Sequence, residues 1–250
     1  MPGRQMTGFL HDMCSSFMRD GAVCIACTTS DAPPSLLEDA RATLSAPEAV
    51  RLDTMRAPGK RAEFLLSRLV LKSVARALFG GEHNEITLTR DAKGAFIIEG
   101  TGEPGIHASL SHCPGALALM FARESRVGVD IEPERRVTRA VARRFFSSRE
   151  FEETARGANP QGELTTRWTL KEAFAKASGV PLLRALHGAE FVREDAGYRL
   201  RESIDGCGTE WSFLSAAAAG GFRLAAARRG TVMPVLVECG DASLLAGLLG

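Results

Sequence analysis

The segment Val127-Gly128-Val129-Asp130-Ile131-Glu132 decides how the rest of the chain is interpreted. Its small and β-branched residues favour a strand, whose alternation sends Val129 and Ile131 to one face and Asp130 and Glu132 to the other. Two carboxylates held together at a strand end repel each other and raise each other's pKa unless a cation lies between them, and oxygen-only ligands suit Mg²⁺. The alternative is a strand that has simply reached solvent.

A second segment, Arg167 to Ala177, consists of good helix formers. It places Trp168, Glu172 and Lys176 at positions i, i+4 and i+8, so an aromatic ring, a carboxylate and an amine share one helix face. A Glu-to-Lys pair at this spacing is usually an exposed ion pair, and Trp is usually a core residue. Taken alone, the segment is therefore compatible with an ordinary surface helix.

Hydrophobic periodicity and Gly, Pro and Asp punctuation divide the chain into helices and short strands. Helices are predicted over residues 35–52, 60–79, 139–146, 148–155 and 164–178. Strands are predicted over residues 85–89, 95–98, 106–110, 116–122, 127–131, 190–193, 198–202, 210–216, 222–227 and 232–237. Both halves run helices first and strands second, which predicts an α+β fold of two similar lobes, residues 1–120 and 121–250, each with helices packed on a small antiparallel sheet.

The bulk composition excludes several classes of protein. A chain of 250 residues that is 45% hydrophobic and 24% charged is globular, and its formal charge of +1 offers no global field for nucleic acid or membrane. The six cysteines are scattered and fit reduced thiols; Cys24 and Cys27 have C-x-x-C spacing, for which a buried strand is favoured over a metal or redox role. Charged residues interrupt the apolar patches of the first thirty residues, so we expect a cytoplasmic protein.

Together the two segments resemble the surfactin-synthetase-activating type of 4'-phosphopantetheinyl transferase, whose hallmarks are a Gly-[Val/Ile]-Asp-[Ile/Val]-Glu strand followed by a Trp-x-x-Lys-Glu-[Ala/Ser] helix. Two further elements match: Arg144-Phe145-Phe146-Ser147-Ser148-Arg149-Glu150, in which Ser147 and Glu150 also form a capping-box pattern, and Ser109-Leu110-Ser111-His112-Cys113. Residues 179–192 resemble the family's linker into its next strand. The resemblance covers residues 47–228 and implies the two-lobed 4'-phosphopantetheinyl transferase fold.

The resemblance also implies a reaction. Asp130, Glu132 and Glu172 would hold Mg²⁺, with Mn²⁺ as an alternative ion, and coenzyme A would be the co-substrate. Lys171 and Lys176 would add positive charge for its pyrophosphate. For Lys171 the alternative is solvent, because it lies about 100° around the helix from Glu172. A serine hydroxyl of an apo acyl or peptidyl carrier protein would attack the phosphorus attached to pantetheine and expel adenosine 3',5'-bisphosphate. Glu172, directly or through a metal-bound water, is the favoured proton acceptor, and Lys176 would stabilise the transferring phosphoryl group.

On the coenzyme A side, the resemblance assigns His112 and Ser111 to the 3'-phosphate. Arg61 and Arg68 lie two helical turns apart and resemble the family's basic positions for the nucleotide phosphates, although a solvated basic face is the alternative. One departure is clear, because Gly94-Ala95-Phe96 stands where relatives carry Gly-Lys-Pro. Lys93 is then the candidate substitute for the missing lysine, and the alternative is a lower affinity for coenzyme A.

The partner is expected to be the carrier protein, which presents an acidic helix beside its serine. The candidate docking surface is the basic and aromatic stretch Arg139, Arg143, Arg144, Phe145 and Phe146, with one phenylalanine packed inward and the arginines in water. Two lobes in one chain also predict a monomer. The competing hypotheses are a non-catalytic coenzyme A-binding module of the same fold and, more distantly, a metal-dependent phosphodiester hydrolase.

Overall fold

The computed structural model describes residues 2–29, 34–91, 95–195, 197–208, 210–232 and 235–241, so Lys93 and Gly94 lie outside the described part. The first half contains α1 (Pro2–Asp20), β1 (Ala22–Thr28), α2 (Pro34–Ala42), α3 (Ala46–Thr54), α4 (Pro58–Phe79), β2 (Thr87–Arg90), β3 (Phe96–Glu99), β4 (Ile106–Cys113) and β5 (Ala116–Arg123). The second half contains β6 (Val127–Pro133), α5 (Arg139–Phe145), α6 (Ser148–Arg156), α7 (Pro160–Ser178), α8 (Leu182–Gly188), β7 (Phe191–Glu194), β8 (Gly197–Leu200), β9 (Trp211–Ala218), β10 (Phe222–Arg229) and β11 (Leu236–Asp241). The mixed α+β composition agrees with the prediction.

Local sequence explains where the predicted first helix divides. Residues 35–52 form α2 and α3 instead of one helix, because Ser45 takes an extended conformation and its backbone N–H donates to the Glu48 carboxylate at 3.0 Å. This capping arrangement starts α3 afresh. The sequence analysis also missed α1 and the short α8, which lies inside the expected linker of residues 179–192.

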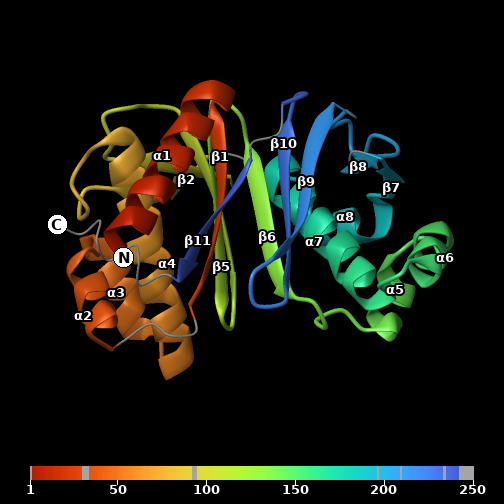
Figure 1. Ribbon diagram of the computed structural model, residues 1–250, viewed down its shortest axis with the longest axis horizontal. Coiled ribbons are helices and arrows are strands. Elements are labelled where there is room, and N and C mark those ends of the chain that lie inside the picture. The colour runs from red at the N-terminus through yellow and green to blue at the C-terminus, as the bar shows by residue number, and fades with distance from the viewer. Residues whose placement is uncertain are drawn as a thin grey trace.

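The strands form two main sheets that pack face to face, as Figure 1 shows. The larger sheet has the order β11-β1-β5-β4-β3-β2, and the smaller has the order β6-β10-β9. Helices α1 to α4 cover the outer side of the larger sheet, and α7 covers the outer side of the smaller one (Figure 1). The layers are therefore helix, sheet, sheet and helix.

The last strand departs from the prediction. We expected β11 to end an antiparallel second-lobe sheet, but it pairs in parallel with β1 of the larger sheet, Ile25 opposite Val237. The final strand of the chain thus completes the sheet formed by the first half. The larger sheet therefore includes one parallel pair, so the expectation of purely antiparallel sheets was wrong at this edge.

Small side chains fill the space between the two sheets. The layer contains many buried alanines from β1, β5 and β10, among them Ala22, Ala118 and Ala226, together with Val129 and Ile131 of β6. Cys24 belongs to the same layer, and burial raises the pKa of its thiol to about 12. That is the buried-strand alternative for the C-x-x-C pair, since a reactive thiol needs a lowered pKa.

None of the described helices is both long and apolar enough to cross a membrane.

Candidate active site

The site begins where β6 meets α7, and Gly128 allows the two backbones to come together. A Cβ placed on Gly128 would lie 1.9 Å from the carbonyl oxygen of Ala173 and 2.8 Å from the backbone nitrogen of Ala177. Only a residue without a side chain fits there. This close approach brings the carboxylates of β6 beside the face of α7 that carries Glu172 and Lys176.

Asp130 is the most enclosed of the predicted metal ligands, with only 2% of its surface exposed. Its Oδ1 accepts hydrogen bonds from Ser111 Oγ at 2.8 Å and from Lys176 Nζ at 2.9 Å. Among the described residues its Oδ2 has no hydrogen-bond partner although it is buried. A buried carboxylate oxygen without a partner costs free energy, so this atom is open to a cation.

Glu132 and Glu172 are half-buried, and the charge of Asp130 acts on both. Burial and the charge of Asp130 raise the pKa of Glu132. Burial, Asp130 and Glu132 raise the pKa of Glu172 to about 7, against the opposing effect of Lys176. The expectation from sequence, that the two strand carboxylates raise each other's pKa, agrees with the structure at Glu132.

The three carboxylates have the donor atoms that a hard divalent cation requires, but their side chains are not grouped tightly around one point. Their donors are all oxygens, the set that Mg²⁺ prefers, and Asp130 supplies an open buried one. Within the described residues, however, no three His, Cys, Asp or Glu side chains are grouped closely enough to hold a metal ion. The ammonium of Lys176 supplies the positive charge next to Asp130, and it also donates to the carbonyl of Val129 at 2.8 Å.

Ser111 and His112 lie at the end of β4 that faces this site. Ser111 uses its hydroxyl to hold Asp130, and the hydroxyl of Ser109 accepts a hydrogen bond from the backbone nitrogen of Val129 at 3.0 Å. These two serines thereby tie β4 to β6 across the junction of the sheets. His112 is exposed, with Nδ1 3.4 Å from a carboxylate oxygen of Glu63 on α4.

Lys171 is not where the sequence analysis placed it. Its side chain is fully buried, and its ammonium donates to Glu150 at 2.9 Å and to the carbonyls of Leu186 and Ala189 at 3.1 and 2.5 Å. The assignment to the pyrophosphate was therefore wrong, because all three donors are used on the side of α7 that faces α6 and α8. Lys171 instead joins the Trp-x-x-Lys-Glu helix to Glu150 of the preceding motif.

Glu150 makes more contacts than the capping box predicted from the sequence. The capping box with Ser147 is present, with Ser147 Oγ accepting from the backbone nitrogen of Glu150 at 3.2 Å. The side-chain carboxylate of Glu150 also accepts hydrogen bonds from Lys171 and, at 3.1 Å, from the backbone nitrogen of Phe191. The capping pattern identified the first role, but the long-range partners gave no sequence signal.

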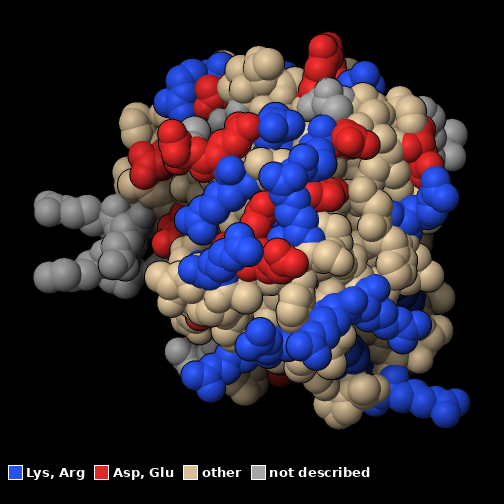
Figure 2. Space-filling model, turned by 90° about the vertical axis from the view of Figure 1, so that its right-hand side faces the viewer, with Lys and Arg blue, Asp and Glu red and all other residues tan. Residues whose placement is uncertain are grey.

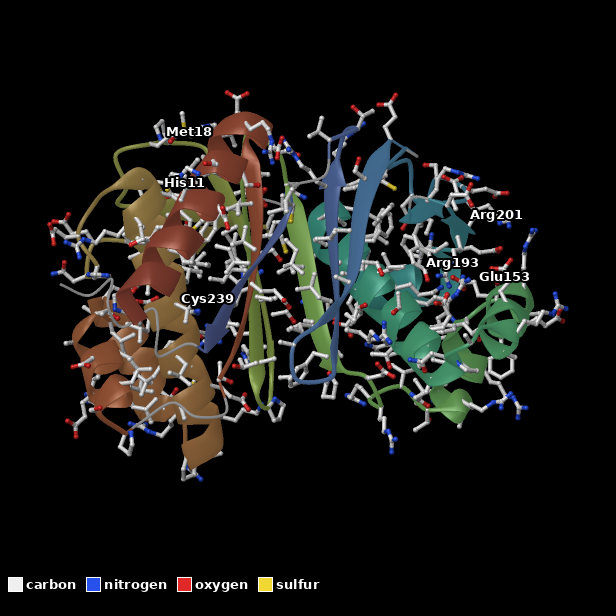
Figure 3. The ribbon with its side chains drawn as sticks, viewed as in Figure 1. His11, Met18, Glu153, Arg193, Arg201 and Cys239 are labelled. Atoms are coloured by element: carbon white, nitrogen blue, oxygen red, sulfur yellow. The ribbon has the colours of Figure 1, made fainter. Side chains whose placement is uncertain are left out.

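Further ion pairs fasten the outer side of α7, and two of the residues that take part, Glu153 and Arg193, are labelled in Figure 3. Glu153 binds Arg167 of α7 at 2.8 Å, and Arg193 lies 3.5 Å from Glu163 of the same helix. Arg167 is only 1% exposed. This side of α7 is therefore held by the lobe itself, which leaves Glu172 and Lys176 to face β6.

Arg61 and Arg68 do not form the basic face proposed for the nucleotide phosphates. Arg61 donates to the carbonyls of Leu52 and Met55 at 2.6 and 3.2 Å, where it closes the C-terminal end of α3. Arg68 is buried and lies 3.0 Å from Glu48. Both the phosphate assignment and the solvated alternative were wrong for Arg68, because its guanidinium is a partner of α3.

The docking candidates divide as expected. Phe146 is buried and Phe145 packs edge-to-face on Trp168 with ring centroids 5.7 Å apart, while Arg139, Arg143 and Arg144 are exposed. Figure 2 shows the side of the molecule that carries α5 and α6, where Lys and Arg side chains line the lower part of the face. The exposed arginines of α5 thus form a cationic surface beside Trp168, the aromatic residue on the face of α7 that carries Glu172 and Lys176.

Comparison with known proteins supports the family indicated by the motifs. Residues 126–227, from just before β6 into β10, match the family model of the 4'-phosphopantetheinyl transferase superfamily. The chain is 32% identical over 155 residues to the 4'-phosphopantetheinyl transferase HetI of Nostoc sp. (strain PCC 7120 / SAG 25.82 / UTEX 2576), across 60% of this chain and 65% of that protein. It is 25% identical over 117 residues to the 4'-phosphopantetheinyl transferase psf-1 of Bacillus pumilus, across 46% of this chain and 49% of that protein. The match thus covers less than two thirds of either relative's length, and it confirms the resemblance to the superfamily.

Proposed function

We propose that this member of the 4'-phosphopantetheinyl transferase superfamily transfers the 4'-phosphopantetheine arm of coenzyme A to a serine of an apo carrier protein. The observation that carries the proposal is the buried Asp130 carboxylate, with one oxygen held by Ser111 and Lys176 and the other without a partner. This site lies inside the segment that matches the superfamily model. Both relatives are named for this transferase activity.

Asp130, Glu132 and Glu172 would hold a magnesium ion once their side chains draw closer together than they lie in the structure, and the ion would polarise the phosphoryl oxygens and neutralise their charge when bound. The chain's own residues supply the rest. Lys176 is placed to pair with anionic oxygen near Asp130, and Ser111 fixes the orientation of that carboxylate. Without a cation the pKa of Glu172 is raised to about 7, and its carboxylate is the group that we propose accepts the serine proton.

The carrier protein would approach over α5, where Arg143 and Arg144 offer positive charge to an acidic helix. Because Phe145 contacts Trp168, which lies one helical turn from Glu172, this surface is continuous with the face of α7 that carries the site. We also propose that the protein is monomeric and cytoplasmic. Light scattering coupled to gel filtration tests the first of these statements.

The decisive experiment incubates the full chain with coenzyme A, MgCl₂ and a purified apo carrier, and measures the carrier by intact mass spectrometry. We expect a mass gain of one phosphopantetheine arm, abolished by chelation with EDTA and restored by added Mg²⁺. Absence of the gain with acyl and peptidyl carriers, while coenzyme A still binds, would instead identify a non-catalytic binding module. Release of adenosine 3',5'-bisphosphate without any carrier would identify hydrolysis.

Variants connect the activity to the site. Asp130→Asn and Glu172→Gln keep the side-chain shapes and remove one charge each, so we expect turnover to fall by about 100-fold or more while circular dichroism stays unchanged. Glu38→Gln, at an exposed carboxylate of α2, is the matched control and should keep the parent rate. Near-parent rates in Asp130→Asn would refute the assignment of this carboxylate.

A further inference from the structure

Arg223 of β10 lies directly opposite Glu132, one of the proposed metal ligands, in the sheet that carries the site. The antiparallel register of β10 and β6 pairs these two residues, and Ala225, two residues further along β10, is paired with Asp130. Residues opposite one another in an antiparallel pair project from the same face of the sheet, with Cβ atoms about 5 Å apart. The long side chain of Arg223 can therefore reach the Glu132 carboxylate, on the face of the sheet that α7 covers.

Arg223 forms its ion pair with a different carboxylate, that of Glu134. Nε and Nη2 of Arg223 donate to Oε2 of Glu134 at 3.0 and 2.8 Å. Glu134 comes two residues after Glu132, at the end of β6, where its backbone nitrogen donates to the carbonyl of Gly221 at 2.9 Å. Glu132 lies 3.8 Å from Arg136, whose side chain is 59% exposed. Glu134 thus binds the cation that faces Glu132 across the two strands.

The beginning of α7 holds Glu134 in place. Asn159, which caps α7, donates from Nδ2 to Oε1 of Glu134 at 2.8 Å, so Oε2 is the oxygen that receives Arg223. The backbone carbonyl of Glu134 also accepts hydrogen bonds from Gln161 Nε2 at 3.3 Å and from Thr165 Oγ1 at 2.7 Å. Because α7 binds both the side chain and the main chain of Glu134, the ion pair has a fixed direction.

Gly162 in the first turn of α7 provides the space for this ion pair. A Cβ on Gly162 would lie 2.5 Å from Nη2 of Arg223 and 2.6 Å from Nδ2 of Asn159. Both obstacles are ends of flexible side chains, whereas the obstacle at Gly128 is backbone. An added methyl group at Gly162 would therefore displace the guanidinium and leave the helix in place.

We propose that Glu134 is a positioning residue for the metal site, because it binds Arg223 and so prevents this guanidinium from pairing with Glu132. The Glu132 carboxylate is then left for the cation, since an arginine and a metal ion compete for the same carboxylate oxygens. No bond is made or broken. The inference rests on the proposed function, in which Glu132 is a metal ligand.

Binding of Mn²⁺ to the full chain tests the inference without any turnover. Free aqueous Mn²⁺ is measured by electron paramagnetic resonance during a titration, since this ion accepts the same oxygen ligands as Mg²⁺. Glu134→Gln removes the charge that holds Arg223, and we expect it to weaken Mn²⁺ binding by about 2- to 5-fold, the range of a partly exposed ion pair. Glu103→Gln is the matched control and should bind Mn²⁺ as the parent does. Glu103 has the same 32% exposure as Glu134 and also binds an arginine, Arg123, whose guanidinium lies over the ring of Phe17 in α1.

Substitution of Arg223 separates competition from a general effect of charge. Glu134→Gln removes a negative charge near the site, which by itself weakens cation binding. Gly162→Ala displaces the guanidinium without changing any charge and should weaken Mn²⁺ binding by a similar factor. In the Arg223→Gln background the loss from Gly162→Ala should disappear and the loss from Glu134→Gln should shrink, because no guanidinium is left to compete. Equal losses with and without Arg223 would overturn the inference, since a general charge effect or a distorted helix acts in both backgrounds.

Glu132→Gln distinguishes this inference from the proposed function. We expect this variant to bind Mn²⁺ more weakly than Glu134→Gln does, because it changes the ligand itself. If Glu132→Gln binds Mn²⁺ as the parent does, the metal assignment in the proposed function is wrong and the inference fails with it. If Glu132→Gln weakens binding and the parent modifies a carrier, but the losses are equal in both Arg223 backgrounds, only the role of Glu134 is refuted.

Discussion

Replacing Gly128 by alanine tests the contact on which the site is built. The added Cβ would lie 1.9 Å from the carbonyl oxygen of Ala173, and this obstacle is backbone, which cannot rotate away as a side chain can. Ala173 and Ala177 are both fully buried, so α7 must move outward by more than 1 Å to reach ordinary contact distance. Strand and helix would then separate at the point where Asp130 meets Lys176.

The cost can be bounded from this geometry. Overpacking a core typically costs about 1–3 kcal/mol, and occasionally more. Because the clash is with main chain and the displaced helix also loses its alanine packing, we expect about 3 kcal/mol for Gly128→Ala. A domain is stabilised by only about 5–15 kcal/mol, so the variant should still fold with a much reduced reserve.

Urea denaturation followed by circular dichroism measures the effect. A loss of about 3 kcal/mol should lower the unfolding midpoint by about 1 M. Gly8→Ala is the matched control, because Gly8 lies in α1 and a Cβ there would meet nothing within 4 Å. Alanine should stabilise that helix by about 0.5–1 kcal/mol. If Gly128→Ala and Gly8→Ala both unfolded at or above the parent midpoint, the close approach of β6 to α7 would be refuted.

Three further expectations follow from the same contacts. Because the pKa of Glu172 is raised to about 7 in the folded protein without metal, the stability that this group contributes is present at low pH and is lost as the pH rises through about 7. Mg²⁺ should therefore raise the melting temperature more at pH 8 than at pH 6. Glu172→Gln should remove this difference. Lys171→Met should cost about 3–5 kcal/mol in urea denaturation by leaving buried Glu150 without one partner, with partial recovery in Lys171→Met/Glu150→Gln; weaker coenzyme A binding at unchanged stability would contradict this role. Arg143→Ala with Arg144→Ala should raise KM for the carrier by about 3- to 10-fold at low salt and much less at high salt, whereas an equal change in kcat would place them in the chemistry.

Local patterns predicted the elements of the site well. The strand predicted over residues 127–131 is β6 and the helix predicted over residues 164–178 is α7, because alternation and helix-forming composition are properties of contiguous residues. The i, i+4 relation of Glu172 and Lys176 predicted that both side chains share one face of α7, and in the structure Lys176 donates to Asp130 while Asp130 raises the pKa of Glu172. These features needed no knowledge of the rest of the chain.

Partners distant in sequence could not be predicted in this way. Helix geometry indicated only that Lys171 is displaced from Glu172 around α7, and solvent was the plain alternative to the ligand. The structure places it instead against Glu150, whose distance in sequence hides the pair. Arg68 and Glu48 are a second pair that the sequence does not reveal. Periodicity predicts which side of a helix a residue occupies, but not which element covers that side.

The end of the chain shows the same limit at the level of topology. Residues 232–237 have strand composition, and a strand is present at Leu236–Asp241, but composition does not select its neighbour. Its pairing with β1 joins segments from opposite ends of the sequence. The order of helices and strands in the two halves therefore suggested a division of the sheets that the last strand does not follow.

The contacts among the motifs explain why they carry information together. Gly128 of the first motif touches Ala173 of the second, Glu150 of the intervening segment binds Lys171, and Ser111 of the upstream element holds Asp130. Each contact joins two motifs, so each motif supplies what another needs to keep its position. The effect of a substitution within one motif therefore depends on its partner in another. Substitutions of Lys171 are best combined with substitutions of Glu150, and a substitution of Gly128 is best assessed by the displacement of α7.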